Sequence, residues 1–350
     1  MRVLCVAPYF YPKPGGLERY AYEICKRIAE ENEVRVICSG EANNGNHETQ
    51  KMDGMDIFRL PISFRISNTP ISFRLPFKVR KLLDWCDVVY AHSPVPFYAD
   101  IALIFRKKPS LLVYHSGDVR GDGVTGVLAS AYLRFEKRII SSADVVAGVS
   151  EFVKRKLKGS EVITPGVDHE FFKPVAEKRD HILFVGQLRR GHEWKGLDVL
   201  LQAAARIDCR VVVVGDGDLR QKYERLAERL NISASFRGYM SDTDMPEAYS
   251  SAKLLVLPSK TDQESFGMAL LEANACGTGV VGTRAGGIPW YIRDGKNGIL
   301  TEKNTVKLAH AISSGLEKYR KLGRIGRIIS RDYSWENSAK KTERILNSLI

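Results

Sequence analysis

The chain has 350 residues, of which 44% are hydrophobic and 27% charged, a composition that excludes a disordered protein and allows two folded domains. No run of eighteen apolar residues occurs, so we expect no membrane-spanning helix. The formal net charge of +12 is compatible with nucleic acid, an anionic membrane face or a phosphorylated substrate, but no nucleic-acid module is recognisable, so we expect no nucleic-acid partner. Six scattered cysteines without a C-x-x-C spacing are typical of reduced thiols in a cytoplasmic protein.

Short apolar runs alternate with amphipathic stretches through the first half of the chain. The pattern predicts strands at residues 3–7, 34–38, 87–91, 110–114 and 144–149, with helices at 17–31, 75–84, 96–105 and 127–140. Such alternation predicts a parallel sheet covered by helices on both faces. Gly15 and Gly16 stand between the first strand and the first helix, where doubly wound domains bind ligands and a missing Cβ lets backbone approach a phosphate. An ordinary glycine-rich turn is the alternative.

Residues 58–81 are unusually basic and aromatic. They contain six cations and four phenylalanines but no acid, and residues 105–108 add a second basic patch. Such a stretch could dock on anionic lipid headgroups, which would imply a lipid-linked acceptor and a peripheral location at the inner membrane face. The alternative is a solvated basic face whose phenylalanines pack inward.

The alternating pattern restarts after residues 171–178, a charged, proline-containing segment that we interpret as a linker. Strands are predicted at 181–186, 211–214 and 254–257, and helices at 196–206, 266–275, 304–316 and 317–329, followed by a final helix that ends at residue 350. We therefore place one domain at residues 1–170 and a second at 171–332, with the last helix at 333–350.

Two glutamates flank the predicted helix that follows the strand at 254–257. Glu264 lies at the mouth of this helix and Glu272 lies eight residues later. A helix that reached back to Glu264 would place them about 12 Å apart along its axis. A hydrolase pair needs roughly 5 to 9.5 Å, so this spacing instead suits a ligand with hydroxyl-rich ends and an anionic middle. The helix N-terminus would face that anion.

Residues 282–289 read GTRAGGIP, and two glycine turns follow at 294–295 and 297–298. Together with Pro258-Ser259 and the two glutamates, these segments resemble the donor-binding signature of the GT-B retaining glycosyltransferases, the family-four group. Trp290 stands where many members carry a glutamate, a departure that bears on sugar selection. The resemblance covers nearly the full chain and is weakest between residues 40 and 110.

The resemblance implies an α/β fold of two Rossmann-like, doubly wound parallel-sheet domains facing a cleft, with the last helix packed on the first domain. It also implies retaining transfer of a sugar from a UDP-sugar or GDP-sugar to an acceptor hydroxyl, with no cofactor and no metal ion. The acceptor would be a lipid-linked or polysaccharide precursor in cell-surface glycan synthesis.

The resemblance also assigns roles to individual residues. His115 would lie beside the reacting sugar and Glu264 would grip its hydroxyls. Lys195 would bind the diphosphate, together with Arg190 or Arg189, because Gln187 stands where the family commonly has arginine. The remaining donor-binding positions are Gly15, Gly16, Gly238, Tyr239, Met240, Ser265, Phe266, Gly267, Met268 and Glu272. His92 and Asp118 are placed on the acceptor side, where Asp118 would also help to orient His115.

The sequence is also compatible with two other functions. A sugar-nucleotide epimerase shares the two-domain architecture but would consume donor without an acceptor. A non-catalytic protein that binds anionic surfaces would explain the charge but would give Glu264 and Glu272 no role.

Overall fold

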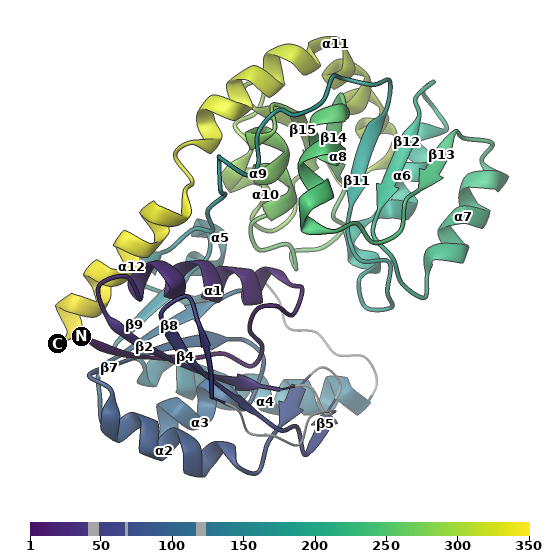
Figure 1. The fold of residues 1–350 in the computed structure, drawn as a ribbon. Coiled ribbons are helices and arrows are strands. Elements are labelled where there is room, and N and C mark those ends of the chain that lie inside the picture. The colour runs from purple at the N-terminus through teal and green to yellow at the C-terminus, as the bar shows by residue number, and fades with distance from the viewer. Residues whose placement is uncertain (41–48, 67–68, 117–123) are drawn as a thin grey trace. The chain divides into compact units, whose positions relative to one another are not determined.

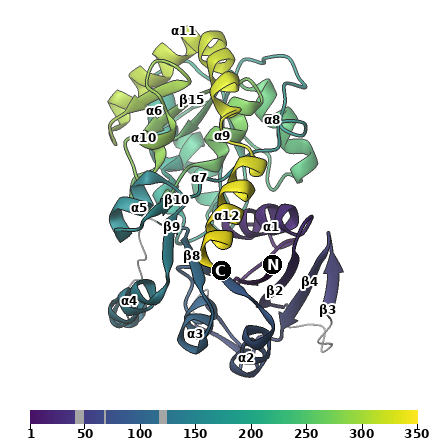
Figure 2. The same ribbon diagram turned by 90° about the vertical axis from the view of Figure 1, so that its left-hand side faces the viewer.

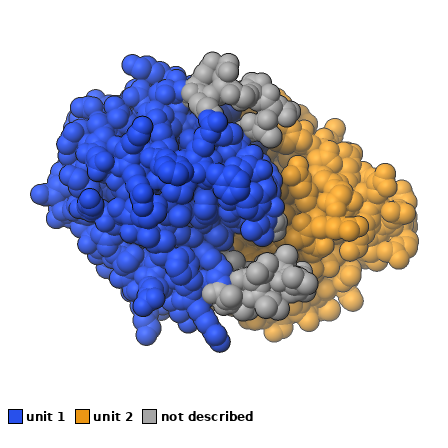
Figure 3. Space-filling model, turned by 90° about the horizontal axis from the view of Figure 1, so that it is seen from below, with its two compact units in different colours: residues 1–165, 335–350 blue, residues 166–334 orange. Residues whose placement is uncertain are grey.

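A computed structural model describes residues 1–40, 49–66, 69–116 and 124–350. The chain divides into two compact units, which Figure 3 shows in different colours. Unit 1 comprises Met1–Pro165 and Trp335–Ile350, and unit 2 comprises Gly166–Ser334. None of the helices in the described ranges is long and apolar enough to cross a membrane.

Unit 1 contains a mixed sheet with the strand order β10-β9-β8-β7-β1-β2-β4-β3. All neighbouring strands are parallel except β3 and β4, which pair antiparallel. The strands are β1 (Arg2–Val6), β2 (Glu33–Ser39), β3 (Thr49–Met52), β4 (Met55–Leu60), β7 (Val88–Ser93), β8 (Ser110–Tyr114), β9 (Val145–Gly148) and β10 (Glu161–Val162). Two short strands, β5 (Phe64–Ile66) and β6 (Thr69–Ile71), pair antiparallel outside this sheet.

The helices of unit 1 are α1 (Gly16–Ile28), α2 (Leu75–Trp85), α3 (Tyr98–Phe105), α4 (Val124–Ser142), α5 (Glu151–Leu157) and α12 (Trp335–Leu349). The helix α12 packs on α1 although more than 300 residues separate them in the sequence (Figure 1). Arg27 forms an ion pair with Glu336 at 2.7 Å, and the fully buried Trp335 ring lies 6.0 Å from the ring of Tyr20. The end of the chain is therefore part of the core of unit 1.

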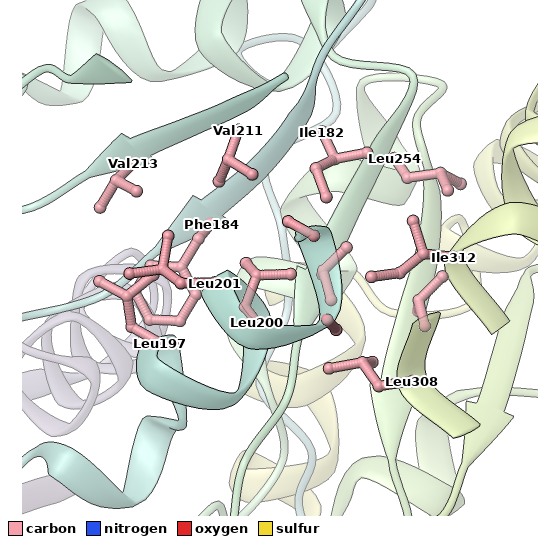
Figure 4. Close-up of a cluster of buried hydrophobic side chains, with 14 of the residues drawn as sticks. Ile182, Phe184, Leu197, Leu200, Leu201, Val211, Val213, Leu254, Leu308 and Ile312 are labelled. Carbon is pink, nitrogen blue, oxygen red and sulfur yellow. The ribbon is translucent and has the colours of Figure 1, made fainter. Parts of the chain in front are cut away.

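Unit 2 contains a six-stranded parallel sheet with the order β13-β12-β11-β14-β15-β16. Its strands are β11 (Ile182–Val185), β12 (Val211–Val214), β13 (Ala234–Phe236), β14 (Leu254–Leu257), β15 (Gly279–Thr283) and β16 (Gly298–Thr301). Its helices are α6 (Leu197–Ala204), α7 (Arg220–Arg229), α8 (Met245–Ser251), α9 (Met268–Ala275), α10 (Ile288–Tyr291) and α11 (Thr305–Ser330), with 3-10 turns η1 (Glu193–Lys195) and η2 (Asp242–Asp244). Apolar residues of β11, β12, β14, α6 and α11 form one core cluster (Figure 4).

Both sheets are doubly wound, which confirms the predicted fold class. In unit 1 the chain first adds β2, β3 and β4 on one side of β1 and then adds β7 to β10 on the other side. In unit 2 it first adds β12 and β13 on one side of β11 and then adds β14 to β16 on the other side. Ligands of such folds bind beside the carboxyl ends of the strands where the order reverses. A ligand site is therefore expected in the loops after β1, β7, β11 and β14.

The predicted bounds need three corrections. The helices expected at 304–316 and 317–329 are one 26-residue helix, α11, because Gly315 does not end it. A Cβ at Gly315 would lie 2.8 Å from the Leu254 side chain, so this glycine lets α11 pack closely on β14. The helix expected from residue 266 begins at Met268, since Gly267 has a left-handed φ of +90°, and Glu264 therefore lies outside it. The supposed linker at 171–178 belongs to unit 2, where Phe172 is buried in the core.

Candidate functional site

An ion pair lies at the carboxyl edge of the unit 2 sheet, in the loops that follow β11 and β14. Lys195 Nζ lies 3.3 Å from Glu264 Oε2, and the side chains are only 21% and 12% exposed. The Lys195 ammonium also lies 4.7 Å from the centre of the Trp194 ring. Partial burial weakens solvent screening, so the Lys195 ammonium interacts with an adjacent anion more strongly than a fully exposed ammonium would.

The loop that carries Lys195 is fastened to the loop after β14. Lys260 N donates to Trp194 O at 2.7 Å. Gly196 has φ +76°, and a Cβ there would lie 2.1 Å from Pro258 O. Only glycine fits this approach without backbone movement. The main chain, and not the ion pair alone, therefore holds Lys195 beside Glu264.

The glycine pair in the GTRAGGIP segment positions the Glu264 backbone. Gly287 N donates to Glu264 O at 2.7 Å. A Cβ at Gly286 would lie 2.0 Å from Glu264 O, and one at Gly287 would lie 1.9 Å from Ser265 O. Asp262 Oδ1 closes the same turn by accepting from Gly286 N at 3.0 Å and from Lys303 Nζ at 3.2 Å. The close approach of Gly286 and Gly287 to the carbonyl groups of Glu264 and Ser265 explains why both positions are glycine.

The helix α9 begins directly beyond this turn. Phe266 is buried, and its ring packs 5.5 Å from Tyr291 and 5.7 Å from Tyr333. Gly267 is the N-cap of α9, and Leu270 N donates to Gly267 O at 2.9 Å, so the N–H groups that the helix leaves unpaired at its start are those of Met268 and Ala269. Glu272 lies within α9, and its Oε2 accepts a hydrogen bond from the Tyr249 hydroxyl at 2.7 Å. Glu272 thus has a fixed orientation that the sequence did not reveal.

Arg190 pairs with a different carboxylate, that of Asp218. Its Nε lies 3.3 Å from Asp218 Oδ2, its backbone N–H donates to Asp218 Oδ1 at 3.0 Å, and its side chain is 85% exposed. Asp216 accepts from Gly217 N at 2.8 Å, as expected for turn chemistry in the Asp216-Gly217-Asp218 segment. In the described part of the chain, no group of three or more His, Cys, Asp or Glu side chains is placed to hold a metal ion.

The turn at Gly238, Tyr239 and Met240 lies beside the loop after β12. Gly238 O accepts from Gly215 N at 2.8 Å, and the Tyr239 side chain is 68% exposed. Arg220, a residue that the sequence analysis does not predict at this turn, donates to Phe236 O at 3.0 Å and pairs with Glu224 at 2.8 Å. The i, i+4 spacing of Arg220 and Glu224 is the signal that could have identified it.

In unit 1, Gly15 and Gly16 lie at the start of α1, as predicted. Glu18 folds back over them, so that a Cβ at Gly15 would lie 2.0 Å from Glu18 Oε2. Burial raises the pKa of Glu18 above its usual value. A carboxyl group thus occupies the positive end of α1, where the sequence predicts the donor phosphates to lie. Glu18 was missed because a glutamate in a first helical turn is common.

His92 and His115 form a pair at the carboxyl ends of β7 and β8. His92 Nδ1 lies 2.9 Å from His115 Nε2. The Tyr20 ring lies 4.7 Å from the His115 ring, and the Tyr90 ring lies 4.4 Å from the His92 ring. Burial lowers the pKa of His115 to about 3 and that of His92 well below its usual value. Both rings are therefore neutral near pH 7, and one donates to the other.

The prediction that His92 faces the acceptor is wrong, because His92 is fully buried and its Nδ1 contacts His115. Its position instead supports a role in orienting His115. Asp118, the other residue assigned to the acceptor side, lies outside the described residues.

Comparisons with known proteins match most of the chain. The sequence model described as glycosyl transferases group 1 matches residues 167–346, and that described as glycosyltransferase family 4 matches residues 14–171. D-rhamnosyltransferase WbpZ of Pseudomonas aeruginosa is 27% identical, over 86% of this chain and 82% of its own. Phosphatidyl-myo-inositol mannosyltransferase of Mycobacterium tuberculosis is 26% identical, over 100% of this chain and 97% of its own.

Solved structures share the fold. Sucrose-phosphate synthase from Thermosynechococcus elongatus superposes with a TM-score of 0.80 at 20% identity, covering 99% of this chain and 98% of its own. The Anabaena protein Alr3699/HepE, in complex with UDP and glucose, gives a TM-score of 0.76 at 20% identity over the full length of both chains.

Proposed function

The chain belongs to the glycosyl transferases group 1 family and is a glycosyltransferase that uses a nucleotide sugar, and from that premise we propose its reaction. The chain moves a sugar from a UDP-sugar or GDP-sugar to an acceptor hydroxyl, with retention of anomeric configuration and without a metal ion. The observation that supports this most is the Lys195–Glu264 pair at the mouth of α9. The acceptor is a lipid-linked or polysaccharide precursor on the cytoplasmic side of the membrane.

The reaction requires positive charge where the donor diphosphate leaves. Lys195 and the first N–H groups of α9 would stabilise the charge that develops on the phosphates as the glycosidic bond breaks. The ammonium is already partly withdrawn from water, so it loses little hydration when the phosphates arrive. Arg190 would join them by exchanging Asp218 for the diphosphate, and its exposed side chain has room for that movement.

The two glutamates would hold the two ends of the donor. Lys195 contacts Glu264 Oε2, which leaves Oε1 to accept hydrogen bonds from sugar hydroxyls. Glu272, oriented by Tyr249, would accept from the ribose hydroxyls. The turn at residues 238–240 would contact the base through its backbone.

Retention requires the acceptor to attack the face from which the phosphate departs. The departing phosphate would take the acceptor proton, and the protein would supply position and charge. His115 is proposed to donate a hydrogen bond to the sugar from a neutral ring, because a pKa of about 3 leaves almost no imidazolium near pH 7. This role differs from general acid catalysis, which would require the charged ring.

A donor screen followed by product analysis tests the proposal. Thermal unfolding is measured with UDP, GDP, ADP and their sugars, and the ligand that raises the melting temperature most identifies the donor. NMR of the product with that donor then gives the anomeric configuration. An inverted product would refute retention, and loss of all activity with EDTA would refute the metal-free reaction.

The dependence of donor consumption on acceptor distinguishes the proposed transferase from the epimerase alternative. None of the relatives reported above is an epimerase. A transferase consumes donor only when an acceptor is present, whereas an epimerase converts the donor alone.

A further inference from the structure

The two basic stretches of unit 1 come together in the fold, along the helices α2 and α3 (Figures 1 and 2). The Arg80 guanidinium of α2 lies 4.2 Å from the centre of the Phe105 ring at the end of α3. Residues 58–81 and 105–108, which are separate in sequence, therefore contribute to one surface. We call it the α2–α3 face.

Large apolar side chains project from the α2–α3 face into solvent. Phe73, in the turn that precedes α2, is 68% exposed, and Phe77, in the first turn of α2, is 71% exposed. The Phe64 ring lies 5.8 Å from that of Phe73, and Ile104 of α3 is 50% exposed. A soluble surface rarely shows a cluster of this kind without a partner.

Cations surround these apolar groups. The helix α2 carries Lys78, Arg80 and Lys81 against one acid, Asp84 in its last turn. Within the described ranges, no carboxylate forms an ion pair with Arg74, Arg80 or Lys81. Burial lowers the pKa of Lys78, and the neighbouring Lys81 and Arg35 lower it further. The positive charge of this face is thus largely uncompensated by the protein itself.

A hollow of about 300 Å³ lies among the cations. Its walls include Phe58 and Phe77, and its cationic lining comes from Arg59, Arg74, Lys78 and Lys81. Lys78 Nζ lies 3.9 Å from the centre of the Phe58 ring, so the ammonium is held at an apolar wall. A cationic lining against aromatic walls fits a phosphodiester joined to an apolar chain.

We propose that the α2–α3 face docks on an anionic phospholipid bilayer, with Phe73 and Phe77 inserted among the acyl chains and a headgroup phosphate in the hollow. Charge complementarity selects this partner, because anionic lipid supplies phosphates next to hydrocarbon, as the hollow and the exposed rings require. Docking does not depend on the proposed reaction, since it requires neither donor nor acceptor.

Vesicle sedimentation of the full chain, without nucleotide sugar, tests the proposal. Binding is expected to vesicles with about one third phosphatidylglycerol, to be absent with phosphatidylcholine alone, and to weaken as salt rises. The double variant Arg74→Gln/Lys81→Gln should bind about 25-fold more weakly, at roughly fivefold for each cation near the surface. Phe73→Ser/Phe77→Ser should bind on the order of 100-fold more weakly.

Matched changes on α11 provide the control. Lys307→Gln/Lys321→Gln removes two exposed lysines, and Ile328→Ser removes a side chain that is 62% exposed. Both should bind vesicles as the parent does. Equal losses in these controls, or unchanged binding in the α2 variants, would overturn the proposal, as would binding of an oligonucleotide through the same residues without vesicle binding.

A second measurement does not rely on loss of binding. In Phe77→Trp, the new indole should be quenched by vesicles with brominated acyl chains more than the native tryptophans of the parent are. Vesicle-bound protein without additional quenching would refute insertion of residue 77. A chain that binds vesicles but transfers no sugar would refute the proposed function and leave the docking proposal intact. A chain that transfers sugar but does not bind vesicles would refute the docking proposal and leave the proposed function intact.

Discussion

The substitution Gly287→Ala tests how the Glu264 loop is held. Gly287 has φ −79°, which alanine adopts without strain, so any effect comes from the added methyl group. That Cβ would lie 1.9 Å from Ser265 O and 2.4 Å from Ser265 C. Real Cβ atoms essentially never approach below 3.0 Å, so the loop must retreat by at least 1.1 Å, from 1.9 to 3.0 Å.

This retreat moves the backbone between Glu264 and the start of α9. A misplacement of about 1 Å costs on the order of 100-fold in rate when it affects groups that position a substrate. We therefore expect kcat/KM for the nucleotide sugar to fall about 100-fold. Overpacking of a tight contact should lower the free energy of unfolding by about 2 kcal/mol.

The assay measures initial rates across donor concentrations and, separately, unfolding in urea. Gly295→Ala is the control, because a Cβ there meets nothing within 4 Å. Its φ of +72° costs about 1 kcal/mol of stability, and it should leave kcat/KM unchanged. Parental kcat/KM in a folded Gly287→Ala protein would show that the glycine contact does not position Glu264.

Three further outcomes are expected. Lys195→Ala should lower kcat by about 100-fold to 1,000-fold, since it removes one cation from the leaving phosphates, and undiminished turnover in Lys195→Ala/Arg190→Ala would refute the phosphate assignment. Glu272→Ala should weaken donor binding by about 1.5 to 3 kcal/mol, measured as donor KM, and Tyr249→Phe should have a smaller effect. Equal donor KM values in the parent and both variants would contradict the assignment of Glu272 to the ribose. The folded-state pKa of His115 is depressed to about 3, so its contribution to stability is present above pH 6.5 and is lost as the pH falls towards 3. At pH 5 the loss is about 2 kcal/mol. The variant His115→Gln should therefore show a weaker dependence of the unfolding free energy on pH between 5 and 7.

The sequence predicted the elements of the fold because buried parallel strands leave a strong signal. The runs at 211–214 and 254–257 are uninterrupted and apolar, and both are strands. The contact between Lys195 and Glu264 follows from that signal, since each residue lies in the loop after a central strand and neighbouring strands end at one edge.

Side-chain pairing was less predictable. Arg190 contacts Asp218, which lies in the next βα turn, and sequence spacing gives no indication of that approach. His92 stands at a strand end like His115, yet Tyr20 and Tyr90 enclose it, and those rings come from α1 and from β7 itself. The two helices expected at 304–316 and 317–329 are one helix, α11, and its contact at Gly315 with the Leu254 side chain is likewise not visible in the sequence spacing.

The position of α12 in unit 1 determines how the two units can be produced as separate fragments. Residues 166–334 form one uninterrupted segment, so a single fragment contains the whole of unit 2, whereas unit 1 loses its last helix if the chain is cut at 165. Ser338 donates to Thr164 O at 2.7 Å and Lys341 pairs with Glu161 at 2.9 Å, so the two cut ends of that unit lie close together. A short glycine-serine bridge from Pro165 to Trp335 would restore it as a single continuous polypeptide.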